Sequence, residues 1–225
     1  MAFSPEFLER LRQLEEKYAA MGQDMNSYLD GLLYADYLTY WDYIHLDTLL
    51  SLQNPRTPIP DERIFILYHQ ITELYFRLVL DAIGLLTETD GAPPLDLFKR
   101  QMVRINRYFE QLINWFDIMV DGMDRDEFLR FRMSLLPASG FQSVQYRMIE
   151  MASSELRQLV HISKREQTSD IGSARQLYEV LYWKSGATEL ATGKKTLTLR
   201  QFEAKYSEEL IRFAEKYQAC NLSKL

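Results

Sequence analysis

Apolar residues recur along most of this 225-residue chain at the three- and four-residue spacing of amphipathic helices. The longest example begins at Asp61 and reads DERIFILYHQITELYFRLVLDAIGLL. At the N-terminus, Ser4 followed by Pro5 is typical of a helix start, because serine caps free backbone N–H groups and proline fits the first turn. The pattern predicts a first helix that starts at Pro5 and ends before Gly22, a helical stretch around residues 46–53, and helices over 62–86, 95–120, 126–136, 141–162, 174–184 and 199–219.

Proline, glycine and polar residues mark the connections between these helices. NPRTPIPD holds three prolines and predicts an extended link before the long helix, while PASG ends the helix over 126–136. Thr198 and Gln201 have the spacing of a capping box at the start of the last helix. The polar stretch SKREQTSDIGS is expected to be exposed. Since no strand is expected beyond a short piece near TGKKTLTL, the predicted fold class is all-α, a helical bundle that forms a single domain over residues 1–225.

Composition narrows the classes of protein to which the chain can belong. The net charge of −6 and the absence of a basic stretch argue against a nucleic-acid partner. There is no apolar run long enough to cross a bilayer and no secretory leader, so we expect no membrane partner. One cysteine, Cys220, excludes an internal disulfide framework. These features together predict a cytoplasmic protein.

The first candidate for chemistry is His69, which lies among apolar and aromatic residues. Phe65 precedes it by four residues, so both side chains share one helix face. The ordinary interpretation is a core histidine whose ring nitrogens find a carbonyl or tyrosine partner. The alternative is a neutral imidazole that acts as a base or as a hydrogen-bond partner of a ligand, in which case this face should line a cavity. Glu73 and Arg77 follow on the same helix and are expected to pair.

Two further clusters carry candidate residues. Arg132 is surrounded by apolar residues in FLRFRMSLL and is poorly placed for solvent, and its planar guanidinium suits a carboxylate from the protein or from a ligand. Ser139 follows at the end of the same predicted helix. The tyrosines of YLTYWDYIHLD, including Tyr40 and Tyr43, are typical of interface packing. Composition and spacing alone predict no more than a helical domain with a pocket-like histidine, a pocket-like arginine and many aromatics.

Three segments, in this order, resemble the tryptophan 2,3-dioxygenase family. YWDYIHLDTLLSLQNP is similar to the family's tyrosine-rich entry segment, DERIFILYHQITELYFRLVL to its histidine-bearing helix, and FRMSLLPASGFQSVQYRMIE to its most recognisable motif. Together they span residues 39–150, about half the chain. The resemblance implies an oxidoreductase, usually a homotetramer, that uses haem b and O₂ to open the indole ring of L-tryptophan. The product would be N-formylkynurenine, the first step of the kynurenine pathway of tryptophan catabolism.

The same resemblance implies a role for each candidate residue. His69 would be catalytic and face the indole N–H on the distal side of the haem, and Arg132 would clamp the substrate carboxylate. The remaining substrate-binding residues would be Phe65, Phe128, Leu135 and Ser139, joined by Tyr40, Tyr43 and Ile44 from a neighbouring subunit, with Trp115 flanking the haem. Residues 1–53 would then lie at a subunit interface, 61–163 would form the substrate and haem pocket, and 173–225 would be C-terminal helices.

The proximal haem ligand of the family is not matched. No histidine follows His161, which is expected on a helix in ordinary packing, and SGATELATGKK does not reproduce the family's glycine-rich loop. We therefore expect weak haem binding or none, and a chain that lacks the C-terminal part of the enzyme beyond Leu225. Three hypotheses stay open: a dioxygenase of this type, a related haem-dependent oxygenase acting on another aromatic compound, and a haem-less relative that binds an aromatic amino acid without catalysis.

Overall fold

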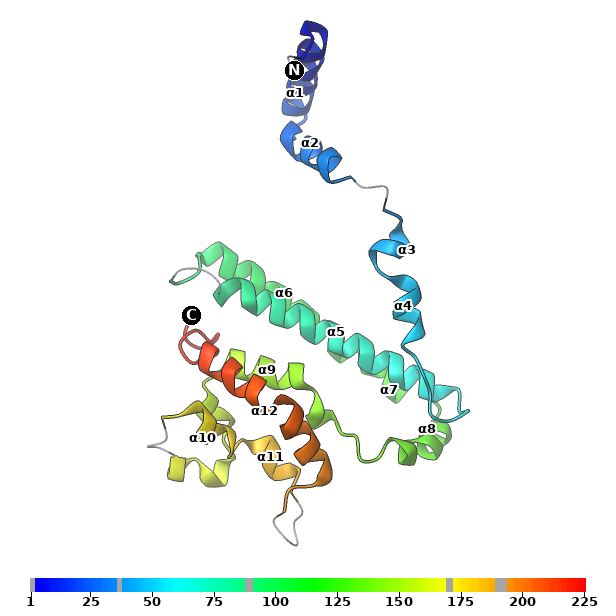
Figure 1. Ribbon diagram of the computed structural model, residues 1–225, viewed down its shortest axis with the longest axis vertical. Coiled ribbons are helices and arrows are strands. Elements are labelled where there is room, and N and C mark those ends of the chain that lie inside the picture. The colour runs from blue at the N-terminus through cyan, green and yellow to red at the C-terminus, as the bar shows by residue number, and fades with distance from the viewer. Residues whose placement is uncertain (1–2, 36–37, 88–90, 169–171, 189–193) are drawn as a thin grey trace. The chain divides into compact units, whose positions relative to one another are not determined.

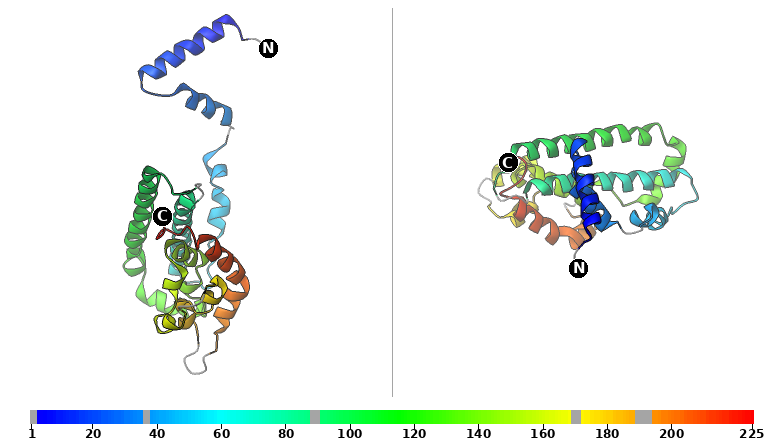
Figure 2. Two further views of the ribbon diagram at one scale, coloured as in Figure 1. Left: turned by 90° about the vertical axis from the view of Figure 1, so that its left-hand side faces the viewer. Right: turned by 90° about the horizontal axis from the view of Figure 1, so that it is seen from above.

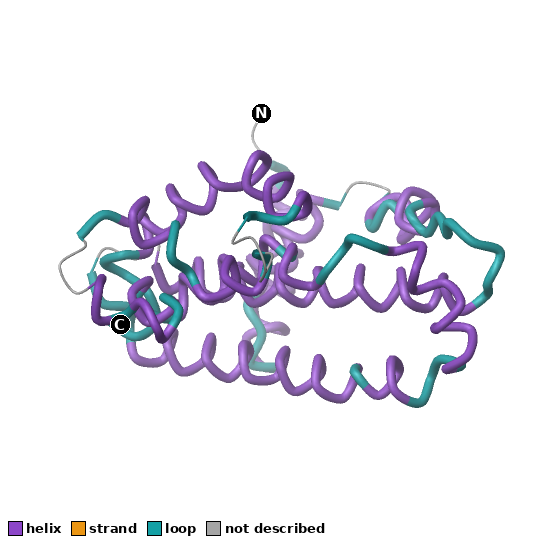
Figure 3. Tube along the Cα trace, turned by 90° about the horizontal axis from the view of Figure 1, so that it is seen from below, coloured by secondary structure: helices purple, strands orange, loops and turns teal. Residues whose placement is uncertain are grey.

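The computed structural model describes residues 3–35, 38–87, 91–168, 172–188 and 194–225. Within these ranges the chain is helical, and Figure 3 shows the helices joined by loops. Its β contacts there are two isolated bridges, Val160 with Leu181 and Thr188 with Lys195. The all-α fold class is therefore confirmed. None of the helices in the described ranges combines the length and the apolar character needed to cross a membrane.

The chain divides into two compact units, Met1–Leu52 and Gln53–Leu225. The boundary between the units lies at the end of the N-terminal segment predicted over residues 1–53. That residues 1–225 form a single domain stays a prediction. The helices of the first unit are α1 Pro5–Ala20, α2 Met25–Tyr34, α3 Tyr40–Tyr43 and α4 Leu46–Ser51.

The first unit consists of short helices that bury none of their own residues. Its first helix starts as predicted, since the Ser4 hydroxyl accepts a hydrogen bond from the Phe7 backbone N–H. Rings of Tyr18 and Tyr28 stack at 4.5 Å between centroids and join α1 to α2. His45 has a positive φ of 51° and separates α3 from α4. The apolar stripes of this unit are thus formed but not covered.

The second unit is built on a pair of long helices, α5 (Asp61–Thr87) and α6 (Leu95–Trp115), which lie side by side and antiparallel (Figures 1 and 2). Helix α9 (Val144–Ser153) packs against α5, and α12 (Leu197–Tyr217) packs against α9. The apolar faces meet in a core made of Val79, Ala82, Ile83, Ile105, Ile149, Ala152 and Tyr217. The long apolar periodicity therefore folds as predicted.

Glu62 fixes the entry to α5. Its buried carboxylate accepts hydrogen bonds from the backbone N–H groups of Arg56 and Thr57, each at 2.7 Å, and from the Thr57 hydroxyl at 2.5 Å. Burial alone would raise the pKa of Glu62, but these hydrogen bonds stabilise the carboxylate and hold its pKa below the ordinary value. The proline-rich link before α5 is therefore non-helical, as the sequence predicts, but it bends at residues 56–58 instead of running extended.

After α6 the chain turns through short elements: α7 Asp117–Val120, α8 Arg125–Phe131, then the 3₁₀ helices η1 Arg132–Leu135 and η2 Gly140–Gln142. The helix predicted over 95–120 is therefore interrupted, because α6 ends at Trp115. The predicted helix over 126–136 tightens into 3₁₀ geometry after Phe131, whose side chain is fully buried.

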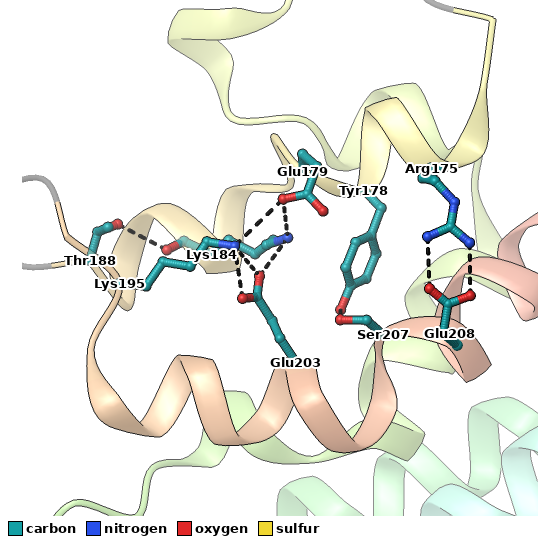
Figure 4. Close-up of polar contacts among 9 residues, drawn as sticks. All are labelled: Arg175, Tyr178, Glu179, Lys184, Thr188, Lys195, Glu203, Ser207 and Glu208. Atoms are coloured by element: carbon teal, nitrogen blue, oxygen red, sulfur yellow. Dashed lines mark hydrogen bonds and ion pairs between the residues drawn. The ribbon is translucent and has the colours of Figure 1, made fainter.

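The C-terminal part forms a second core, with α10 Ala174–Tyr178 and α11 Tyr182–Gly186 packed beside α12. Its largest buried side chains include Tyr178, Leu181 and Leu210. Figure 4 shows the polar layer at its edge: the Nζ atom of Lys184 lies 2.7 Å from Glu203 and 3.0 Å from Glu179. The Lys184 ammonium also lies 4.2 Å from the centre of the Tyr178 ring, whose burial raises the pKa of its hydroxyl to about 12.

Two predicted helices are wrong in this region. The helix predicted over 141–162 ends at Ser153, and the chain continues through the 3₁₀ helices η3 Leu156–Leu159 and η4 Ile162–Lys164. The helix predicted over 174–184 is broken between α10 and α11. Near the ends of these predicted helices, Val160 and Leu181 pair as an extended bridge and His161 N donates to Val180 O, which holds both segments out of helical geometry there.

The start of α12 also differs from the prediction. Thr196, not Thr198, is the N-cap, and its hydroxyl accepts from Leu199 N at 3.2 Å. Thr198 is buried and donates to Pro137 O instead. The strand expected near residues 192–199 lies partly outside the described residues. In the part that is described, Lys195 makes one bridge before α12 begins at Leu197. Of the polar stretch over 163–173, residues 169–171 also lie outside the described residues, and Thr168 is buried.

Candidate functional site

One face of α5 lines an open cavity of about 680 Å³ in the second unit. The helix contributes residues at spacings of three and four, which is why they share this face: Phe65, Tyr68, His69, Thr72, Glu73 and Phe76. Facing residues come from Phe116, from the η1–η2 region and from the start of α9: Leu135, Ala138, Ser139, Gly140, Gln142, Ser143, Tyr146 and Arg147. The lining surface is mostly apolar, and five of its fifteen residues are Phe or Tyr. A smaller cavity of about 150 Å³ between α9, α10 and α12 contains none of the predicted site residues.

His69 presents an acceptor nitrogen at this cavity. Its Nδ1 lies 2.8 Å from the Phe65 carbonyl oxygen, and because a carbonyl only accepts, Nδ1 must carry the hydrogen. In the neutral ring Nε2 is then a free acceptor. The ring is exposed and lies 4.1 Å from the Phe65 ring, centroid to centroid. The interpretation as a sealed core histidine is wrong, and the expectation that the Phe65–His69 face lines a cavity is confirmed.

Phe128 lies behind this face, outside the lining. Its ring is 6.3 Å from Phe65 and 5.5 Å from the buried Phe131, which itself packs edge-on to Phe65 at 5.7 Å. The rings of Phe128 and Phe131 thus pack against the Phe65 ring. Phe128 is therefore next to the lining residue Phe65 without lining the cavity, and its expected contact with a substrate stays a prediction.

Arg132 does not have the environment that the sequence predicted. It is exposed at the start of η1, outside the cavity lining, and forms no ion pair with another described residue. An unpaired guanidinium keeps its hydration, because burial without a carboxylate is too costly. Leu135 and Ser139, three and seven residues later, do line the cavity as expected. The structure thus brings together four predicted site residues, Phe65, His69, Leu135 and Ser139, and leaves Arg132 outside the lining.

The expected Glu73–Arg77 pair is also wrong. Arg77 Nε bonds Asp81 Oδ1 at 2.9 Å, one turn further along α5. Glu73 lines the cavity and accepts a hydrogen bond from Gln145 Nε2 at 2.9 Å, and the same amide donates to the Glu73 carbonyl at 2.8 Å. Gln145 therefore ties α9 to α5 at this point.

Sequence reasoning missed Arg147, a buried cation in the cavity wall. Its Nη1 atom lies 2.8 Å from Glu150 Oε2 and donates to the Tyr182 hydroxyl at 3.0 Å, while its Nε has no partner among the described residues. Burial raises the pKa of Glu150, although the hydrogen bond from the Tyr182 hydroxyl and the charge of Arg147 both favour its ionised form. The available signal was an arginine on the apolar face of α9 with a glutamate three residues later.

The remaining predicted residues are placed as follows. Trp115 stacks in parallel with Tyr68, a lining residue, at 6.4 Å, and its indole nitrogen is buried without an acceptor in the described part of the chain. Tyr40, Tyr43 and Ile44 belong to the first unit, and both tyrosines are exposed, by 71% and 72%. The roles expected for these four residues stay predictions.

A haem needs a flat apolar slot and a strong axial ligand to iron. The aromatic walls suit the first requirement. For the second, His69 is the one histidine or cysteine in the lining: His161 pairs its Nδ1 with Ser163 Oγ at 2.8 Å, and Cys220 lies against Lys216 O at 3.4 Å, both elsewhere. If His69 faces a substrate, no second histidine or cysteine remains in the described lining to ligate iron. The lining therefore does not complete a haem site.

Comparison with known proteins places the chain in a family. The sequence model described as tryptophan 2,3-dioxygenase matches residues 30–218. The tryptophan 2,3-dioxygenase of Ruegeria sp. (strain TM1040) is 40% identical over 118 residues, 52% of this chain and 42% of that protein. The tryptophan 2,3-dioxygenase of Bradyrhizobium diazoefficiens is 38% identical over 113 residues, which is 50% of this chain and 40% of that protein. The tryptophan 2,3-dioxygenase of Bacillus anthracis is 38% identical over 115 residues, which is 51% of this chain and 41% of that protein. The chain thus matches about two fifths of the length of these relatives. Because the family model covers most of its residues, the chain belongs to the tryptophan 2,3-dioxygenase family.

Proposed function

We propose that the α5 cavity binds L-tryptophan and that the chain serves an oxidoreductase of the tryptophan 2,3-dioxygenase type, which opens the indole ring with O₂ to N-formylkynurenine. The observation that carries this proposal is the His69 acceptor set among aromatic walls in a member of this family. An apolar cavity with a few convergent polar groups selects a flat aromatic ligand of this kind.

His69 is the catalytic residue of the proposal. Its Nε2 accepts the indole N–H, which fixes the orientation of the ring and provides a base at that proton. Phe65, held from behind by Phe128, packs against the indole, and Leu135 and Ser139 close the opposite side. Arg132, three residues before the lining residue Leu135, binds the substrate carboxylate, because its exposed guanidinium has no ion-pair partner in the described ranges.

The oxygen chemistry of the family comes from haem b, and the residues described here do not complete its ligation. The residues of this chain therefore bind and orient the substrate and exclude water. We further propose a cytoplasmic homo-oligomer, a tetramer, in which Tyr40, Tyr43 and Ile44 reach a neighbouring subunit's site and Trp115 flanks the haem.

The test is calorimetric titration of the chain with L-tryptophan and with indole. Arg132→Ala should weaken tryptophan binding about 10- to 100-fold, the loss of a charge-assisted contact of roughly 1.5–3 kcal/mol, and leave indole unaffected. His69→Ala should weaken both ligands while the thermal melting temperature stays close to that of the wild type. Equal losses for both ligands in Arg132→Ala would assign that residue a structural role only.

A second candidate function is a haem-less relative that binds an aromatic amino acid without catalysis, and the incomplete axial ligand set favours it. Titration with haem distinguishes the two. We expect no sharp Soret band at one-to-one stoichiometry. A tight one-to-one complex that is abolished by Cys220→Ser or His161→Ala would contradict this expectation. It would show that the chain supplies its own proximal haem ligand from outside the cavity lining, and it would favour the dioxygenase.

A further inference from the structure

The charged side chains that line the cavity are not balanced. In the described residues they are Glu73 and Arg147. Arg147 is neutralised by Glu150 at 2.8 Å. Glu73 has no ion-pair partner there, because Arg77 pairs with Asp81 on a neighbouring turn. The cavity therefore carries one uncompensated negative charge, which favours a cationic ligand.

The Glu73 carboxylate is held in place with one oxygen to spare. Gln145 Nε2 donates to its Oε2 at 2.9 Å and to the Glu73 carbonyl at 2.8 Å, so one amide fixes both the side chain and the helix. The other oxygen, Oε1, accepts no hydrogen bond from a described residue. Phe76 and Tyr146 line the cavity too, with ring centroids 5.3 Å apart, and aromatic faces attract an ammonium group.

The spacing of Glu73 from His69 matches a ligand with two donors. The two residues are one helical turn apart, about 6 Å along the axis. Both offer acceptors, the imidazole Nε2 and the carboxylate Oε1. Tryptophan carries two N–H donors, the indole nitrogen and the α-ammonium, at a comparable separation. One extended molecule can therefore satisfy both acceptors from the same face of α5.

We infer that Glu73 is the residue that recognises the ligand's ammonium group, so that the cavity selects aromatic compounds bearing a primary amine. The inference rests on the proposed function for its choice of tryptophan, and it adds a specificity-determining residue to that site. The competing explanation is that Glu73 only anchors α9 through Gln145. Glu73→Gln separates the two, because its amide oxygen still accepts the Gln145 hydrogen bond while the charge is lost.

The experiment is calorimetric titration of the full chain with L-tryptophan, tryptamine, 3-indolepropionate and phenethylamine. These probes carry an indole with ammonium and carboxylate, an indole with ammonium only, an indole with carboxylate only, and an ammonium on a plain phenyl ring. Wild type, Glu73→Gln and Glu73→Asp are compared. Glu110→Gln is the matched control, since it makes the same acid-to-amide change at an exposed position of α6 outside the cavity. Thermal melting confirms that each variant is folded.

Glu73→Gln should weaken tryptophan and tryptamine about 10- to 100-fold, equivalent to roughly 1.4–2.8 kcal/mol, and leave 3-indolepropionate unchanged. Glu73→Asp should keep part of the affinity, and Glu110→Gln should match the wild type. Equal losses for all ligands, or none for the amines, would overturn the inference. If the wild type binds phenethylamine through Glu73 but no indole, the inference holds and the proposed function falls. If the wild type binds none of the four, both fall.

Discussion

The two units of the chain are built from similar amphipathic helices but differ in what covers their apolar faces. In the first unit Leu33 and Tyr34 are 80% and 85% exposed, and no residue of α1–α4 is buried. In the second unit Phe131, Tyr178 and Leu210 are completely buried. The same periodicity therefore predicts a helix in both units, but it does not say which surface covers that helix. Exposed apolar side chains gathered on one segment are typical of a surface that meets another chain, which supports the proposed oligomer.

The largest effect is expected at the buried ammonium of the second unit. Lys184 is 5% exposed and bridges Glu203 and Glu179, so Lys184→Met leaves Glu203 without its buried partner. Breaking such a pair costs about 3–5 kcal/mol in unfolding free energy, measured by urea denaturation. Lys195→Met is the control, since Lys195 bonds the same carboxylate at 2.8 Å but is 44% exposed, and should cost ~1 kcal/mol or less. Equal costs would mean that burial does not set the strength of this cluster.

A matched pair of leucines tests the contrast between the units directly. Leu210→Ala removes a completely buried side chain from the C-terminal core and should cost about 2–5 kcal/mol. Leu33→Ala makes the same change on an exposed position of α2 and should stay within ~0.5 kcal/mol at concentrations where the chain is monomeric. Denaturation by urea measures both. A loss of several kcal/mol for Leu33→Ala in a monomer would show that the first unit buries its own apolar face.

The assembly itself is tested on the aromatic residues of α3. Tyr40→Ser combined with Tyr43→Ser removes two exposed rings and should weaken association by roughly 1–2 kcal/mol per ring if they are buried by another copy. Light scattering at micromolar concentration should then show a smaller species than the wild type. Leu95→Ser, an exposed apolar position at the start of α6, is the control and should leave the mass unchanged. A wild-type monomer under the same conditions would contradict the proposal that Tyr40 and Tyr43 reach the site of a neighbouring subunit.

Much of the fold was predictable because local patterns and long-range packing agree in the long helices. Ser4, the proline-rich link and the 27-residue α5 follow from capping, backbone restriction and apolar period. The predictions fail where a distant contact decides the backbone. Val160 and Leu181 are 21 residues apart, and their bridge converts two expected helices into short pieces, a pairing that no local window contains.

The candidate site was predictable to a similar extent, and for a related reason. Phe65 and His69 are joined by helical spacing alone, so their shared face followed from the sequence. The partner of an ion pair is chosen by geometry across elements, and this is why Glu73 binds Gln145 of α9, not Arg77. The sequence did not indicate that Arg147 is buried, because its partner Tyr182 lies on a different helix.

The smallest effect is expected at the boundary of the second unit, where Glu62 ties the link at Arg56 and Thr57 to α5. Its hydrogen bonds hold the pKa in the folded state below the ordinary value, which is about 4.3 in an unfolded chain. The carboxylate thus contributes stability that is fully present above the unfolded pKa and is lost as the pH falls through the folded pKa. Urea denaturation of the wild type between pH 6 and about pH 3 should show this loss below about pH 4.3, whereas Glu62→Gln, which does not titrate, should show a shallower decline. Glu155→Gln, an exposed acid-to-amide change, is the control and should follow the wild-type slope. Parallel slopes for the wild type and Glu62→Gln would mean that this carboxylate does not fix the edge of the second unit.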